Sequence, residues 1–88
     1  DDYADINKDG TIDLLGDFNM NGREIENLPN FIRFNIAYGD FYAANNKFTS
    51  LEGFPKEVHG DFSIYGTSKK WKENDIRKKI KIKGTIWN

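Results

Sequence analysis

The tripeptide Gly-Asp-Phe occurs three times in this chain of 88 residues, beginning at Gly16, Gly39 and Gly60. The glycines are 23 and 21 residues apart, and the sequence GTI at 84–86 follows 24 residues later with the same order of small, polar and apolar residues. A period of roughly 20 to 25 residues is typical of solenoid proteins, in which each repeat is one turn of chain stacked on the next. The spacing therefore favours a structural repeat over a loop shaped for catalysis.

Apolar and polar residues alternate after each of these glycines, which predicts a short strand in every copy. In the second copy, Phe41 and Ala43 are expected to point into a core. The alternate residues, expected to point outward, are Asp40, Tyr42 and Ala44. Stacking the copies predicts a parallel sheet with strands about 4.8 Å apart, and the rest of each copy returns irregularly across the core.

Asn46 occupies the asparagine position of a repeat of the type L-x-L-x-x-N-x-L-x-x-L. An asparagine amide can bond backbone groups in a turn that has no sheet partner. The first copy has Arg23 at this position, and an arginine side chain offers no acceptor. We therefore expect the first turn to be looser or to be held differently.

The third copy ends in a different pattern. Trp71, Ile76 and Ile80 recur at helical spacing among charged residues, which predicts a helix over 69–80. Residues 81–87 alternate and predict one final strand. This helix and strand are expected to cap the open end of the stack, as solenoids require.

The middle of the chain resembles a known family. The stretch NNKFTSLEGFPKEVHGDF (45–62) is similar to the repeat N-x-L-T-S-L-E-G-x-P-K-x-V-x-G-x-F of short leucine-rich-repeat-like proteins of tailed bacteriophages. The opening DGTIDLLGDFNMNGREIENLP resembles their N-terminal cap and WKENDIRKKIKIKGTIWN resembles their closing segment, so the resemblance covers roughly residues 6–88. It implies a small solenoid encoded by a virus or prophage. Most members have no assigned activity, and the repeat class usually binds proteins.

These patterns together predict one mainly β domain over residues 1–88, a short leucine-rich-repeat-like parallel β-solenoid with a C-terminal helix. The expected parts are an N-terminal cap (1–15), repeat coils (16–66) and a C-terminal helix-strand cap (67–88). The chain has no cysteine, which excludes disulfides and thiolate chemistry. No apolar run approaches the roughly 20 residues that span a membrane, so no membrane contact is expected.

Charge is divided along the chain, although the net charge is only −1. Residues 1–61 hold twelve acidic and five basic residues, whereas residues 69–83 hold two acidic and eight basic residues. We define a basic patch by the residues Lys69, Lys70, Lys72, Arg77, Lys78 and Lys79. The simpler interpretation of this basic segment is a solvent-exposed helix face beside a strand. The alternative is that the segment contacts an acidic partner or nucleic acid.

The outward strand positions suggest non-catalytic protein binding, because Tyr and Trp are common interface anchors. The candidate partner-binding residues are Asp40, Tyr42, Asp61, Ser63, Tyr65 and Trp87. The resemblance to phage proteins implies a host protein as partner and the cytoplasm of a bacterial host as location. The alternatives are that these side chains only pack on one another, that the basic segment 69–83 binds nucleic acid, or that the protein is purely structural.

No arrangement of acid, base and nucleophile is visible, so we expect neither catalysis nor a cofactor. His59, the single histidine, is expected to be a loop residue. Asp17, Asp40 and Asp61 would form a column in a stacked sheet. Repulsion within such a column invites a metal ion or a basic partner. The preferred interpretation is that each aspartate bonds backbone at the start of a strand.

The segment DINKDGTID (5–13) partly matches a calcium-binding EF-hand loop, with Asp5, Asn7, Asp9 and Asp13 at ligand positions. Gly16 stands at the position where an EF-hand loop has its bidentate carboxylate. No amphipathic helix precedes the loop. A polar turn leading into the first strand is the preferred interpretation, and calcium binding stays open.

Overall fold

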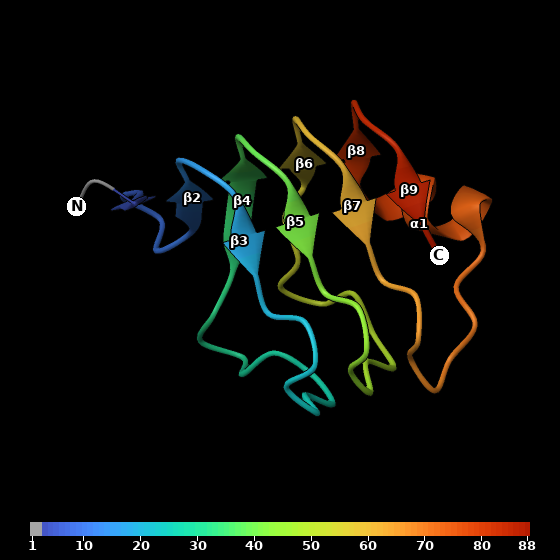
Figure 1. The fold of residues 1–88 in the computed structure, drawn as a ribbon. Coiled ribbons are helices and arrows are strands. Elements are labelled where there is room, and N and C mark those ends of the chain that lie inside the picture. The colour runs from blue at the N-terminus through green and yellow to red at the C-terminus, as the bar shows by residue number, and fades with distance from the viewer. Residues whose placement is uncertain (1–2) are drawn as a thin grey trace.

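The computed structural model describes residues 3–88 as a β-solenoid in which each turn of chain gives one strand to each of two sheets (Figure 1). Sheet A has the order β1 (Ala4–Ile6), β2 (Ile12–Leu14), β4 (Phe34–Ala37), β6 (Glu57–Val58) and β8 (Lys81–Ile82). Sheet B has the order β3 (Phe18–Asn19), β5 (Phe41–Tyr42), β7 (Phe62–Ser63) and β9 (Ile86–Trp87). Among the strand pairs of residues 3–88, β1 and β2 alone run antiparallel. The predicted mainly β solenoid with a C-terminal helix is confirmed.

Equivalent positions of successive copies lie side by side in sheet B. Phe18 pairs with Phe41, Phe41 with Phe62, and Phe62 with Ile86 in an unbroken register. The rings of Phe41 and Phe62 are stacked, with centroids 6.0 Å apart and planes 12° apart. The phenylalanine of each Gly-Asp-Phe copy therefore forms a ladder of apolar side chains along the core.

The sequence predicted one strand per copy followed by an irregular return, whereas each turn has a second strand, which belongs to sheet A. These strands are very short, so alternation alone does not distinguish them from loop. A regular signal does precede each corner, because an apolar residue stands two positions before each glycine. The residues are Leu14, Ala37, Val58 and Ile82, and all four are buried.

The core lies between the sheets and is dominated by aromatic rings. Phe41, Phe48 and Phe62 are completely buried, and Phe54 meets Phe48 edge to face with ring centroids 4.9 Å apart. Each such ring contributes about 1.5–3 kcal/mol by leaving water. Trp71, which precedes α1, is also buried in this core.

The C-terminal part contains α1 (Glu73–Lys79), which is shorter than the helix predicted over 69–80. It begins after Lys72, whose side chain makes no capping hydrogen bond, and Ile76 is its buried residue. The predicted strand over 81–87 is two strands, β8 and β9, because Gly84 turns the chain from sheet A to sheet B. The closing segment thus repeats the corner of the earlier turns. Within residues 3–88, no helix has the length and apolar character needed to cross a membrane.

Candidate functional site

Three aspartates, Asp17, Asp40 and Asp61, form what we call the aspartate column, along the corner where sheet A turns into sheet B. Oδ1 of Asp17 accepts a hydrogen bond from the backbone N–H of Asp40 at 2.7 Å. Oδ1 of Asp40 accepts from the N–H of Asp61 at 2.7 Å, and Oδ1 of Asp61 accepts from the N–H of Thr85 at 2.8 Å. The preferred interpretation of backbone bonding is confirmed, and the backbone group belongs to the next turn.

The corner glycines make room for these carboxylates. A Cβ placed at Gly39 would lie 2.3 Å from Oδ1 of Asp17, and one placed at Gly60 would lie 2.1 Å from Oδ1 of Asp40. A Cβ placed at Gly84 would likewise collide with Oδ1 of Asp61 in the preceding turn. Because such distances are far inside van der Waals contact, each aspartate requires a glycine one turn later. This requirement is the physical reason for the repeated Gly-Asp pair.

Tyr42 is tied to the aspartate column. Its hydroxyl donates a hydrogen bond to Oδ2 of Asp40 at 2.7 Å. That bond first, then burial and the negative charges of the column, raise the pKa of Tyr42 to about 12. The N–H of Asp61 and then the Tyr42 hydroxyl hold the pKa of Asp40 below its usual value. Both carboxylate oxygens of Asp40 are therefore occupied, and Tyr42 supports the column as well as contributing to the surface.

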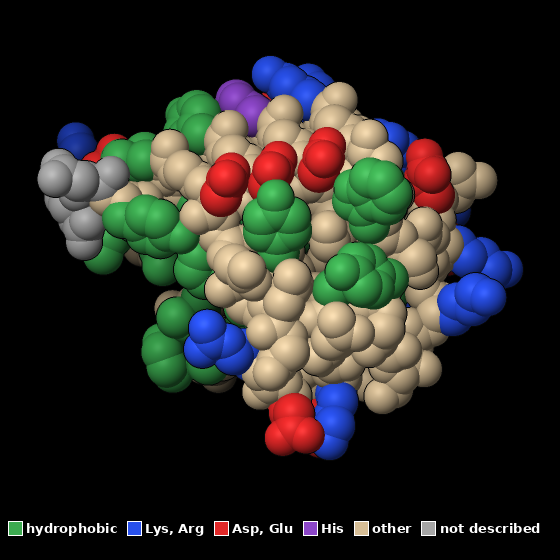
Figure 2. Space-filling model, in the orientation of Figure 1, with side chains coloured by type: hydrophobic (Ala, Val, Ile, Leu, Met, Phe, Trp, Pro, Cys, Tyr) green, Lys and Arg blue, Asp and Glu red, His purple; other side chains and the backbone are tan. Residues whose placement is uncertain are grey.

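Tyr65 and Trp87 are the most accessible of the predicted binding residues, with 46% and 53% of their surface exposed. Trp87 lies in β9, and Tyr65 is the second residue after the end of β7. Figure 2 shows acidic side chains in a line across this face, with large hydrophobic side chains beside them. We call the surface formed by the aspartate column, Tyr42, Tyr65 and Trp87 the outer face of sheet B.

Ser63 and Ala44 were expected to point outward, but both are buried. Ser63 lies between Tyr42 and Trp87 in the strand register. A small side chain between two large neighbours is covered by them, although it points to the same side of the sheet. Ser63 is buried and therefore does not present its hydroxyl to a partner.

Asn46 holds the first turn, in which Arg23 takes the place of the asparagine. Its Oδ1 accepts hydrogen bonds from the backbone N–H groups of Arg23 at 3.0 Å and Ile25 at 3.1 Å. Its Nδ2 donates to the carbonyl oxygens of Met20, Ala43 and Ala44 at 2.8, 3.3 and 3.1 Å. The asparagine of the second copy thus holds the turn of the first copy, so this buried amide is structural.

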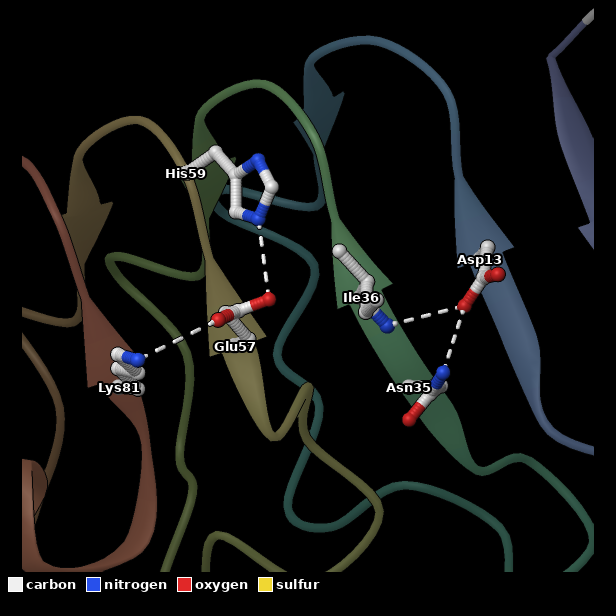
Figure 3. A network of polar contacts seen from close by, with 6 residues as sticks. All are labelled: Asp13, Asn35, Ile36, Glu57, His59 and Lys81. Atoms are coloured by element: carbon white, nitrogen blue, oxygen red, sulfur yellow. Dashed lines mark hydrogen bonds and ion pairs between the residues drawn. The ribbon is translucent and has the colours of Figure 1, made fainter.

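His59 belongs to a network of polar side chains on sheet A. Its Nε2 lies 3.0 Å from Oε2 of Glu57, whose other oxygen lies 4.0 Å from Nζ of Lys81 (Figure 3). The hydrogen bond to His59 is the main cause that lowers the pKa of Glu57. The His59 ring also meets the Tyr38 ring edge to face, with centroids 5.0 Å apart. No Ser or Thr hydroxyl takes part in these contacts.

The segment that resembles a calcium loop folds as a β-hairpin, with Asp5 opposite Asp13. Asp9 accepts hydrogen bonds from the N–H and hydroxyl of Thr11, and these bonds lower the pKa of Asp9. Oδ1 of Asp13 instead binds the next turn, accepting from Nδ2 of Asn35 and from the N–H of Ile36 (Figure 3). The hairpin does not have the helix–loop–helix form of an EF-hand. Across residues 3–88, no group of three or more His, Cys, Asp or Glu side chains is placed to hold a metal ion.

The basic patch is partly neutralised by local contacts. Arg77 pairs with Glu73 at 3.0 Å, and Nζ of Lys78 lies 4.0 Å from its nearest carboxylate. Nζ of Lys69 lies 4.2 Å from the centre of the Trp71 ring, which is a cation–π contact. The remaining members are exposed and form no ion pair within the described chain; they are Lys70, Lys72 and Lys79. The six side chains therefore do not form one continuous unpaired surface.

Comparison of the chain with models of protein families, with curated proteins and with solved structures found no match.

Proposed function

We propose that this domain is a non-catalytic protein-binding module that uses the outer face of sheet B. The observation that carries the proposal is the exposure of Tyr65 and Trp87 beside the aspartate column on one face. Large rings offer contact area at a low cost in side-chain entropy, and Tyr and Trp are enriched at the centres of protein interfaces. Trp87 lies in the paired strand β9, and the backbone of Tyr65 is held by a hydrogen bond from the N–H of Asn45 to its carbonyl at 2.8 Å, so the surface is preformed.

The chemistry of this face fits a basic segment of a partner protein. The aspartate column places three carboxylates along one edge, each bound to backbone through one oxygen. Lys or Arg side chains of a partner would meet these carboxylates and lie over the faces of Tyr65 and Trp87. Such charge complementarity speeds association and selects the partner, while the rings supply most of the affinity.

The resemblance of residues 45–62 to short leucine-rich-repeat-like phage proteins supports a phage or prophage origin. On that basis the partner is a bacterial host protein and the place of action is the host cytoplasm. This part of the proposal rests on the repeat motif and is separable from the binding surface itself.

The test is capture of partners from bacterial lysate, followed by measurement of Kd for the purified partner with matched variants. Tyr65→Ala/Trp87→Ala removes the two exposed rings of the outer face of sheet B. The control Leu15→Ala/Tyr38→Ala removes two exposed apolar side chains elsewhere. We expect the first pair to weaken binding by about tenfold or more and the control to change it little.

Equal binding by both double variants, with both still folded, would contradict the proposed surface. Capture of nucleic acid that is lost at moderate salt and on Lys70→Gln/Lys72→Gln substitution would instead favour the basic patch as the functional region.

A further inference from the structure

A hollow of about 360 Å³ lies where the strands of sheet A begin. Thr11 directly precedes β2, Arg33 precedes β4, Lys56 precedes β6, and Lys79 ends α1 shortly before β8. Because the strands stack in parallel, these positions from four consecutive turns meet at one edge. We call this space the cationic hollow.

Positive charge surrounds the cationic hollow. Its charged lining residues are Arg33, Lys56, Lys78, Lys79 and Glu52. Within residues 3–88, Arg33, Lys56 and Lys79 form no ion pair, and Nζ of Lys78 is 4.0 Å from Asp75. Asp9 lies outside the lining, and the charge of Lys56 contributes to its lowered pKa. Four cations and one carboxylate therefore line the hollow, and this net positive charge attracts an anion.

The floor of the cationic hollow is apolar. Phe34, Leu51 and Phe54 line it and belong to the hydrophobic core, with 5–7% of their surface exposed. Gly53, also in the lining, has φ of +83°, and a Cβ there would lie 2.6 Å from a backbone oxygen. The backbone at this point of the lining therefore requires glycine.

We infer that the cationic hollow binds a small organic phosphate. The planar guanidinium of Arg33 offers two parallel N–H donors to phosphate oxygens, and the lysines supply compact positive charge. The organic group of the same ligand would lie against the floor formed by Phe34, Leu51 and Phe54. A dianion suits this site because it offsets the mutual repulsion of several cations at once. This inference is independent of the proposed function, because the residues involved are not those of the outer face of sheet B.

The test is a titration of the full chain with phenyl phosphate, inorganic phosphate and phenol at low salt, followed by calorimetry and NMR. Phenyl phosphate carries both the dianion and the ring, so we expect it to bind at least about fivefold tighter than either fragment, with Kd on the order of 0.1–1 mM. Signals of Arg33 and Lys79 are expected to shift on binding.

Two double variants with the same change in net charge separate a site from general attraction. Arg33→Gln/Lys79→Gln removes cations that line the hollow, and we expect it to weaken phenyl phosphate binding by about tenfold or more. Lys70→Gln/Lys72→Gln removes exposed cations outside the lining, and we expect a change of less than about twofold. Lys79→Gln alone, at the exposed end of α1, provides a variant that retains the fold if the double variant does not.

Equal weakening by the two double variants would overturn the inference, because it would show only attraction to positive charge. Phenyl phosphate that binds no tighter than inorganic phosphate would also overturn it, since the apolar floor would then be unused. An absence of binding at about 10 mM ligand would do the same.

Discussion

The carboxylate of Asp40 accepts a hydrogen bond from the backbone N–H of Asp61 at 2.7 Å, although the two residues are 21 positions apart. Equivalent bonds join the neighbouring turns, from the N–H of Asp40 to Asp17 and from the N–H of Thr85 to Asp61. Backbone hydrogen bonds also join these turns, for example from the N–H of Phe41 to the carbonyl of Asp61, and the aspartate bonds add to them at each corner. Substitutions in the aspartate column should therefore act on the stability of the whole domain.

Asp40→Ala is expected to lower the free energy of unfolding by about 1–2 kcal/mol, because a hydrogen bond to a charged and partly exposed acceptor is lost. Asp40→Asn keeps an acceptor oxygen and is expected to lose less. Urea denaturation of the two variants measures the difference. An Asp40→Ala protein as stable as the parent would show that the column does not hold the turns together.

Gly60→Ala is expected to destabilise the domain by about 1–3 kcal/mol, because the added Cβ would collide with the Asp40 carboxylate and with the Gly39 carbonyl. Gly16 is the matched control, since a Cβ there meets nothing within 4 Å. Gly16→Ala is expected to change stability by less than about 0.5 kcal/mol or to raise it slightly. Thermal unfolding of the two variants makes the comparison, and similar losses would refute the steric argument.

The ionisation of Tyr42 gives the domain a dependence on alkaline pH. The pKa of Tyr42 is raised to about 12, so its contribution to stability is fully present below its ordinary pKa of about 10 and is lost as pH rises toward 12. Asp40 has the opposite sign: its pKa is lowered, so its contribution is present above about pH 4 and is lost as pH falls further.

Absorbance titration of tyrosinate in the parent and in Tyr42→Phe measures the first effect. The difference between the two curves is expected to be centred near pH 12, and Asp40→Asn should move that component downward because the main cause of the shift is removed. A difference curve centred near pH 10 would mean that Tyr42 and Asp40 do not interact in solution.

Asn46→Ala is expected to cost about 3 kcal/mol or more, because it leaves backbone N–H and carbonyl groups of two turns without partners in the interior. Asn27→Ala is a suitable control, since Asn27 is exposed and makes only 3.3 Å contacts with Thr49. Chemical denaturation should show a loss below about 1 kcal/mol for the control. A similar loss in both variants would contradict the structural role of Asn46.

The sequence predicted the features that recur with the period of the repeat. The Gly-Asp-Phe copies predicted stacked strands, inward phenylalanines and aspartates that bond backbone, and each follows from a residue type repeated at one place in the turn. Tyr42 was placed on the correct face, but its bond to Asp40 was not foreseen, because adjacent outward positions in one strand reveal no side-chain rotamer.

Other features depend on contacts between distant parts of the chain. Nothing near Arg23 in the sequence indicates that Asn46 completes its turn, because that contact requires the stacking distance and register. Burial of Ser63 depends on the size of neighbours in adjacent turns. The cationic hollow was missed for the same reason, since Arg33 and Lys56 are isolated basic residues in the sequence and meet Lys79 only after folding.

The bond from Asp40 to Asp61 also gives the stack a direction in time. During synthesis each carboxylate leaves the ribosome before the N–H that it will bind, so the corner of one turn can close only when the next turn has emerged. A chain that ends before the next turn lacks the donor for its last aspartate, so its terminal corner stays open. A chain that ends between Asp40 and Asp61 contains the donor for Asp17 and lacks the donor for Asp40.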